Sequence, residues 1–354
     1  MSDHLLDILL DAGFKAVAVI GMAKNAGKTT VLNHLLSEIC RREMKIAAAS
    51  IGRDGEDYDA VTLKKKPRVM LPPGSVFITT DRLVRRQVSA GKLDARVLAD
   101  LKLETVLGRV YIYQTENGGE AELAGLNRIS GMLDVKNRLI EKTDLFLIDG
   151  ALDRRSSAVP ALADGIILTT GAVVGRDMES VVRATKETTA ILTLPAMEPG
   201  ADRDMAAETL NKGLTVRINR GNSIPLTYDG IPLAPVLLKE TPLESGDVLV
   251  FNGAFTENLA EALIYRRDLP ACTLVVRDGT RVFTTFRSLR LLYSRDIQLR
   301  VMNPMRIAAV TANPHNPLGH DLDKLELVDR LQKELHPLPV RDVENYQDRA
   351  RNDA

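Results

Sequence analysis

One stretch of twenty residues, Val17 to Leu36, constrains the fold of this chain more than any other. Four apolar residues lead into Gly21, a short loop closes at Gly27, and Lys28-Thr-Thr30 opens an apolar pattern typical of a helix. A buried strand, a glycine-bounded loop and a helix N-terminus in this order predict a phosphate-binding P-loop. The helix N-terminus there presents backbone N–H groups and the positive end of its dipole to an anion.

The residue types in this loop predict nucleotide chemistry. In a P-loop the backbone N–H groups surround a phosphate, the lysine reaches the terminal phosphates, and the next hydroxyl group binds Mg²⁺. Lys28 and Thr29 occupy these two positions. Five residues separate Gly21 from Gly27, whereas the commonest pattern has four. The alternative interpretation is an ordinary helix start that carries Gly-Lys-Thr by accident.

The composition argues against a protein that binds nucleic acid or membranes over a large surface. The 354 residues include 47 Lys and Arg and 47 Asp and Glu, so the formal net charge is zero. No apolar run reaches membrane-spanning length, and the N-terminus has no signal-peptide pattern. Cys40 and Cys272 lie in apolar stretches, as buried free thiols do in a reducing compartment. We therefore expect a cytoplasmic protein.

A second strand, Lys45–Ile51, follows the helix predicted over 27–42 and completes a strand–helix–strand unit, which implies a parallel sheet. Directly after it, Asp54 lies in an acidic loop between Gly52 and Gly55. Ligands of parallel sheets bind beyond the carboxyl ends of the strands, so this loop can reach the same phosphates as the P-loop. We predict Asp54 to be a Mg²⁺ ligand or a catalytic carboxylate; a solvated acidic turn is the alternative.

A later apolar run supplies the second candidate carboxylate. Leu145-Phe-Leu-Ile148 is followed by Asp149, a pattern typical of the strand whose aspartate holds the water shell of Mg²⁺ beside a P-loop. Arg154 and Arg155 come next and contact either a phosphate or substrate anion, or the end of a salt-bridged helix. The strand over 163–171 ends in small hydroxyl residues at the same cleft.

Residues 60–125 do not alternate simply between strand and helix. The elements predicted here are strands over 68–71, 75–80 and 109–115 and helices over 81–90 and 93–101. We interpret the region as an inserted or edge β element. Within it, Lys64-Lys-Lys66 precedes Pro67, either as a solvated surface or as a contact to a phosphate or an acidic partner.

The second half of the chain has a different character. A segment containing Pro199-Gly200 is the predicted linker, and alternating strands and helices beyond it, including a strand over 305–311, indicate a second α/β domain over 204–343. The polar residues 344–354 form a tail. The predicted fold is therefore α/β, with a parallel-sheet P-loop nucleotide-binding domain over 1–195 that carries the inserted β element.

The loop over 311–321 contains two histidines, His315 and His320, next to Asp321. Their spacing matches no standard metal site. The other interpretations are a rigid loop in which Asp321 caps the following helix, and a loop that faces a substrate or a partner.

Several stretches together resemble one family of proteins. They are Ile20–Thr29, Ser50–Glu56, Glu122–Gly125, Ile148–Leu152, Val275–Gly279 and Thr311–Pro314. Over nearly its whole length the chain resembles the P-loop subunit of the lysine 5,6-aminomutase reactivase. Its five-residue gap in the loop is similar to that of dethiobiotin synthetase and the cobyrinic-acid amidotransferases.

The resemblance implies an ATP-driven partner of an adenosylcobalamin-dependent aminomutase, working with a second reactivase subunit to release damaged cobalamin. It also implies that the loop contacts the nucleotide through Gly21, Lys24, Asn25, Ala26, Gly27, Lys28, Thr29 and Thr30. No Asp-x-His-x-x-Gly cobalamin motif is present, so the expected ligands are ATP and Mg²⁺. The absence of an Asn-Lys-x-Asp sequence favours ATP over GTP.

Three functions are compatible with these residues. In an ATPase that remodels a partner enzyme, Lys28 stabilises the transferred phosphoryl group, while Thr29 with Asp54 or Asp149 holds Mg²⁺. An ATP-dependent small-molecule ligase of the dethiobiotin-synthetase type shares the loop spacing, and Lys24 would bind the substrate anion there. A binding module that senses nucleotide without turnover is the third.

Overall fold

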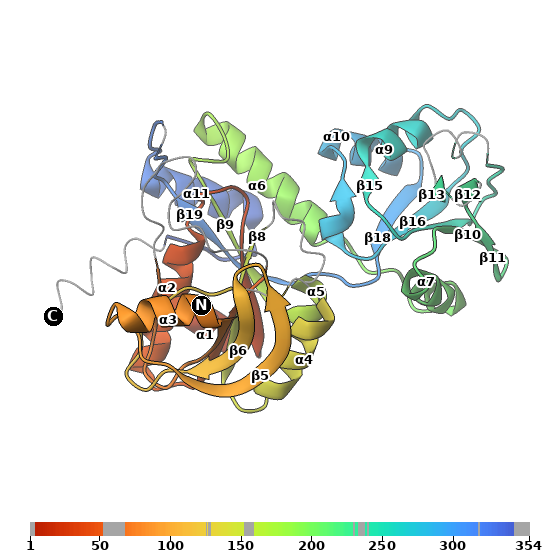
Figure 1. The fold of residues 1–354 in the computed structure, drawn as a ribbon. Coiled ribbons are helices and arrows are strands. Elements are labelled where there is room, and N and C mark those ends of the chain that lie inside the picture. The colour runs from red at the N-terminus through yellow and green to blue at the C-terminus, as the bar shows by residue number, and fades with distance from the viewer. Residues whose placement is uncertain are drawn as a thin grey trace. The chain divides into compact units, whose positions relative to one another are not determined.

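The computed structural model describes residues 4–51, 68–124, 126, 129–151, 159–228, 231–232, 238, 241–317 and 319–342 (Figure 1). The chain divides into two compact units. The first unit comprises Met1–Lys186 and Arg306–Ala354, and the second unit comprises Glu187–Met305. Strands and helices are mixed in both, which confirms the predicted α/β class.

A large, mostly parallel sheet forms the centre of the first unit. Its strands are β1 (Ala16–Gly21), β2 (Ile46–Ser50), β4 (Val76–Thr80), β5 (Arg96–Thr105), β6 (Gly108–Gln114), β8 (Leu145–Ala151), β9 (Gly165–Gly171), β19 (Ile307–Asn313) and β20 (Val340–Arg341). Within the described residues their order is β20-β19-β9-β1-β8-β2-β4-β6-β5. All neighbours from β20 to β4 are parallel, whereas β6 and β5 add an antiparallel edge.

Helices connect these strands and cover the sheet. They are α1 (Leu5–Asp11), α2 (Lys28–Arg41), α3 (Asp81–Ser89), α4 (Ile129–Leu139), α5 (Val159–Leu162), α6 (Met178–Leu192) and α11 (Lys324–Leu335). β1 is buried along its whole length, because a parallel sheet is covered on both faces. α2 turns Val31, Leu35 and Ile39 toward Val17 and Val19 of β1, following the helical period of 3.6 residues.

The order in which the chain adds strands to the sheet changes direction at β1. α2 leads from β1 to β2 on one side, beyond β8, whereas β9 and β19 lie on the other side. The direction of strand addition therefore reverses at β1. In parallel α/β sheets this reversal is where ligands bind, beyond the carboxyl ends of the strands.

The region predicted as an inserted or edge β element does lie at the sheet edge. β4, β6 and β5 follow one another there, and β3 (Val69–Leu71) pairs with β7 (Gly119–Ala121). The helix predicted over 93–101 is wrong, because β5 occupies most of that stretch and pairs with β6. Along β5, alternate residues from Ala99 to Thr105 are half-buried, which is the period of a strand.

The second unit contains a smaller sheet. Its strands are β10 (Val216–Asn219), β11 (Asn222–Pro225), β14 (Val248–Phe251), β16 (Cys272–Val276) and β18 (Ile297–Val301). In the order β11-β10-β14-β16-β18, the last three strands are parallel. Among the described residues, helices that lie wholly in this unit include α7 (Ala201–Asn211), α9 (Glu257–Ile264) and α10 (Phe286–Tyr293). Short pairs join β12 (Thr227–Tyr228) to β13 (Ile231–Pro232) and β15 (Phe255–Thr256) to β17 (Val282–Phe283).

The boundary between the two units differs from the predicted one. β19 and α11 fall within the predicted second domain, 204–343, yet they belong to the first unit because β19 pairs with β9. The second unit thus begins within α6 and ends before β19. Strand–helix alternation alone cannot tell which sheet a strand joins, so the sequence pattern is the same for both arrangements.

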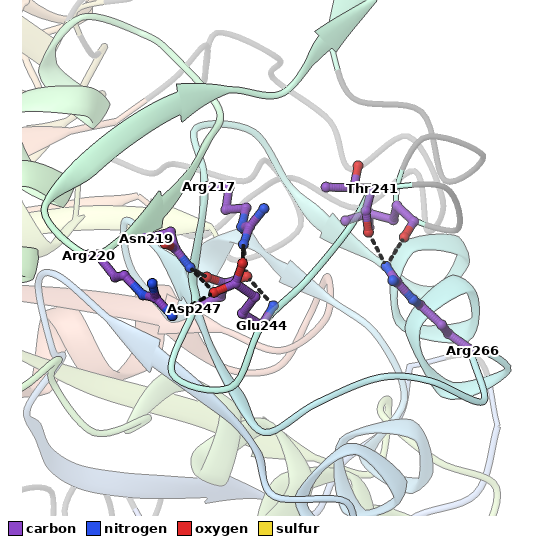
Figure 2. A network of polar contacts seen from close by, with 8 residues as sticks. Arg217, Asn219, Arg220, Thr241, Glu244, Asp247 and Arg266 are labelled. Carbon is purple, nitrogen blue, oxygen red and sulfur yellow. Dashed lines mark hydrogen bonds and ion pairs between the residues drawn. The ribbon is translucent and has the colours of Figure 1, made fainter.

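A buried carboxylate organises one end of the second unit (Figure 2). Asp247 is fully buried and accepts hydrogen bonds from the Asn219 side chain (2.6 Å) and the Glu244 N–H (2.7 Å). Arg217 Nε lies 2.7 Å from Asp247 Oδ2 as an ion-pair partner. Nearby, Arg266 Nη1 donates to the carbonyl oxygen of Leu238 at 2.9 Å. The contacts of Asn219 and Arg217 with Asp247 join β10 to the segment before β14.

Both cysteines are free. Cys272 is buried, as expected, and burial raises the pKa of its thiol to about 12. Cys40 is exposed instead, because it shares the outer face of α2 with Ser37, one turn away. Among the described residues, none of the helices combines the length and apolar character needed to cross a bilayer.

Candidate functional site

The loop around Gly27 has the predicted strand–loop–helix order. β1 ends at Gly21 and α2 begins at Lys28. Between them the chain reverses through two residues in the left-handed region, Asn25 with φ 65° and Gly27 with φ 101°. Glycine adopts this conformation without steric cost, and asparagine is among the few other residues that tolerate it. We refer to residues 21–30 as the Gly21–Thr30 loop.

The N-terminus of α2 has no side-chain cap. Its N-cap residue is Gly27, which has no side chain to accept a bond from the first turn. Lys28, Thr29 and Thr30 form the first turn, whose N–H groups have no acceptor inside a helix. These groups mark the positive end of the dipole of a helix of fourteen residues. The geometry suits an anion.

The side chain of Lys28 folds back over Gly21. A Cβ atom placed on Gly21 would lie 2.9 Å from Lys28 Cγ and 3.1 Å from its Nζ. The ammonium group is therefore held within the Gly21–Thr30 loop. Only glycine at position 21 leaves room for this arrangement, which explains why the residue that ends β1 has no side chain.

The register of the sheet brings several polar residues to the same edge. Asp149 on β8 is paired with Val19 on β1 and with Ser50 on β2. Thr169 on β9 is paired with Gly21 and with Thr311 on β19. Paired residues in parallel strands point to the same face, and Val19 packs on the side of α2. These residues therefore lie on the α2 face, beside the loop.

Three hydroxyl groups in this row are buried without a partner among the described residues. They belong to Ser50, Thr169 and Thr311, each at most 2% exposed. Buried hydroxyl groups usually form a hydrogen bond with protein, water or a ligand. The described part of the chain supplies no such partner here, so these hydroxyl groups can bind water or a ligand. Small hydroxyl residues at the end of the 163–171 strand were predicted at this cleft; Ser50 was not singled out as a site residue.

The other predicted site residues fall into two groups. Asp149 is half-buried in β8, and the N–H of Ile51 donates to its carbonyl oxygen at 2.8 Å. The residues that lie outside the described part of the chain are Asp54, Lys64, Lys65, Lys66, Arg154 and Arg155. Asp149 is thus the predicted carboxylate that the structure brings beside β1.

The loop after β19 differs from its prediction. Asp321 does not cap α11; Asp323 does so by accepting from the Glu326 N–H at 2.8 Å. Asp321 instead accepts from the N–H of Asn316 and lies 2.9 Å from His315 Nδ1. These contacts lower the pKa of Asp321. No group of three or more potential metal-binding His, Cys, Asp or Glu side chains occurs among the described residues.

Asn313, at the end of β19, was missed by the sequence analysis although it touches the loop. Its Nδ2 donates to the carbonyl oxygen of Asn25 at 3.1 Å. Comparison with models of known protein families finds no match for this chain, and comparison with curated proteins finds none either.

Proposed function

We propose that this protein is a P-loop nucleotide hydrolase that uses ATP and Mg²⁺. The observation that carries the proposal is the position of Lys28, folded over Gly21 at the uncapped N-terminus of α2. A positive side chain and free backbone donors converge there on one loop. This combination suits the terminal phosphates of a nucleotide better than a neutral ligand.

Each residue of the loop has a role in this proposal. The N–H groups of the first turn of α2 bind phosphate oxygens, and Lys28 stabilises the charge on the phosphoryl group during transfer. Thr29 and Asp149 supply the oxygen atoms that Mg²⁺ prefers. The unpartnered hydroxyl group of Ser50, in register with Asp149, fits a hydrated cation at this edge. When bound, Mg²⁺ neutralises phosphate charge.

We further propose that nucleotide turnover acts on a partner, an adenosylcobalamin-dependent aminomutase, together with a second reactivase subunit. The support is the resemblance in sequence and the size of the second unit, Glu187–Met305, which has its own apolar core. The Gly21–Thr30 loop belongs entirely to the first unit, so the second unit can serve another function. In this proposal it binds the partner.

The test begins with equilibrium binding of MgATP to the purified protein. Lys28→Ala should weaken binding between about ten- and a hundredfold, because it removes charge-assisted hydrogen bonds. Lys45→Ala is the matched control: Lys45 is exposed and precedes β2, at the amino end of the sheet away from the loop. Equal affinity in wild type and Lys28→Ala would contradict the proposal.

Hydrolysis measurements then separate the three functions. The proposal predicts slow release of ADP that changes when the aminomutase or the second subunit is added. Partner-independent conversion of a small acid, with one ADP per product, would favour the ligase. Tight binding with no turnover, even with the partner present, would favour the nucleotide sensor.

A further inference from the structure

The side chain of Asn313 joins the loop after β19 to the Gly21–Thr30 loop. Its Nδ2 group donates to the carbonyl oxygen of Asn25 at 3.1 Å, and its Oδ1 atom accepts from the N–H of His315 at 3.1 Å. An amide can present either its oxygen or its nitrogen on a given side. The bond from His315 requires the oxygen on its own side, so the NH₂ group faces Asn25.

Asn313 is itself held firmly by the sheet. It is the last residue of β19, which pairs with β9 from Ile307 to Asn313. Its carbonyl oxygen accepts from the N–H of Ala172 at 2.9 Å. A Cβ atom on Gly171 would lie 2.0 Å from that oxygen, so the close approach requires glycine there. The amide group of Asn313 is therefore mounted on a rigid strand end.

The contacts of Asn313 fall on the two residues that give the Gly21–Thr30 loop its shape. Asn25 accepts the hydrogen bond and has a φ of 65°. Gly27 has a φ of 101°, and a Cβ atom there would lie 3.5 Å from the Cβ of Asn313. A left-handed asparagine is disfavoured in a free chain and persists where the surroundings fix it. Asn313 provides such a fixed point.

We propose that Asn313 is a positioning residue that holds the Gly21–Thr30 loop in its ligand-binding conformation before any ligand arrives. The proposal rests on the proposed function, since it takes the ligand to be a nucleotide. Its consequence is preorganisation: the loop N–H groups already converge, so less conformational entropy is lost on binding. Without the Asn313 amide the loop samples other conformations, and phosphate binding has to order it.

The first measurement needs no ligand. Amide hydrogen exchange is recorded for peptides covering residues 22–30 in the free protein, because exchange reports local opening. Asn313→Ala and Asn313→Asp should both speed exchange of this loop; the aspartate keeps the shape of the side chain but cannot donate. Asn252→Ala is the control. Asn252 Nδ2 also donates to a carbonyl oxygen, that of Gly213 at 3.0 Å, but within the second unit.

The second measurement is the dissociation constant of MgADP. Asn313→Ala should weaken binding about fivefold, the effect of one neutral hydrogen bond, while Asn252→Ala leaves it unchanged. Unchanged exchange in the loop of the Asn313 variants would overturn the inference, even if their melting temperature fell. If wild type binds no nucleotide, the proposed function fails, whereas loop exchange still decides the role of Asn313.

Discussion

The ammonium nitrogen of Lys28 lies 3.1 Å from the point where a Cβ atom on Gly21 would stand. Gly21→Ala should therefore displace Lys28 and weaken ATP binding about tenfold. The φ of Gly21 is outside the left-handed region, and Lys28 is a flexible side chain. The free energy of unfolding should therefore change by less than about 1 kcal/mol. Nucleotide titration and denaturant unfolding measure the two effects.

Gly253→Ala is the control for this substitution. A Cβ atom there meets nothing within 4 Å, and its φ is also outside the left-handed region. Both quantities should stay at their wild-type values in the control. Native ATP affinity in Gly21→Ala would mean that Lys28 does not bind phosphate from its observed position.

Asp149→Asn should affect the metal more than the nucleotide. Asp149 is in register with Val19 and Ser50, beside the end of β1. If its carboxylate holds the water shell of Mg²⁺, the Mg²⁺ concentration for half-maximal ATP hydrolysis should rise between about ten- and a hundredfold. ATP binding measured without metal should change little.

Asp144→Asn provides the comparison for that experiment. Asp144 lies just before β8, at its amino end, and its carboxylate accepts from the Lys45 N–H at 2.8 Å, a bond that an amide oxygen can also accept. If Asp149→Asn and wild type required the same Mg²⁺ concentration for hydrolysis, Asp149 would not be part of the metal site.

The strand, loop and helix around Gly21 were predictable because each depends on nearby residues. Apolar Val17–Ile20 identifies the strand, Gly27 supplies the left-handed turn, and the spacing of Val31, Leu32 and Leu35 identifies the helix. The local pattern gave a wrong prediction at β5, where a helix was predicted. Three consecutive apolar residues, Val97-Leu98-Ala99, interrupt the alternation that a strand shows. Pairing with β6 decides that segment, and pairing is not a local property.

The contact between Asn313 and Asn25 could not have been predicted from local pattern. The two residues are 288 positions apart, and they meet only because β19 joins the sheet beside β9. The sequence between them would alternate strands and helices in the same way if β19 continued the second sheet. The buried hydroxyl group of Ser50 is similar: its place beside Asp149 follows from register between β2 and β8.

Asp247→Asn should destabilise the second unit by about 3 kcal/mol at pH 7, because it removes the nearer of two carboxylates from the largely buried Arg217 and leaves only Glu244 Oε1, at 3.7 Å. Asp268→Asn is the control: that carboxylate is 74% exposed and pairs with Arg266, so we expect a loss below about 1 kcal/mol. Denaturant unfolding followed by circular dichroism measures both. Equal losses in the two variants would contradict a special role for the buried pair.

The effect of Asp247→Asn should also depend on pH. Burial alone would raise the pKa of Asp247, but hydrogen bonds from Asn219 and Glu244 and the charge of Arg217 together lower it. A lowered pKa means that the carboxylate stabilises the fold above its unfolded value of about 3.9. That stabilisation is lost as pH falls through the folded pKa. The difference between wild type and variant should therefore shrink below about pH 4.

Asp278→Asn should show the opposite trend. Asp278 is 1% exposed, and burial raises the pKa of its carboxyl group above the unfolded value. A raised pKa contributes stability below an unfolded value of about 3.9 and loses it as pH rises through the folded pKa. The amide cannot ionise, and its oxygen can still accept from the Thr280 N–H, as the carboxylate does at 2.9 Å. The free energy of unfolding of Asp278→Asn relative to wild type should therefore rise as pH increases above about 4, whereas that of Asp247→Asn changes only below about pH 4 and is level above it. Unfolding at a series of pH values measures both trends, and a flat or falling difference for Asp278→Asn would contradict the raised pKa.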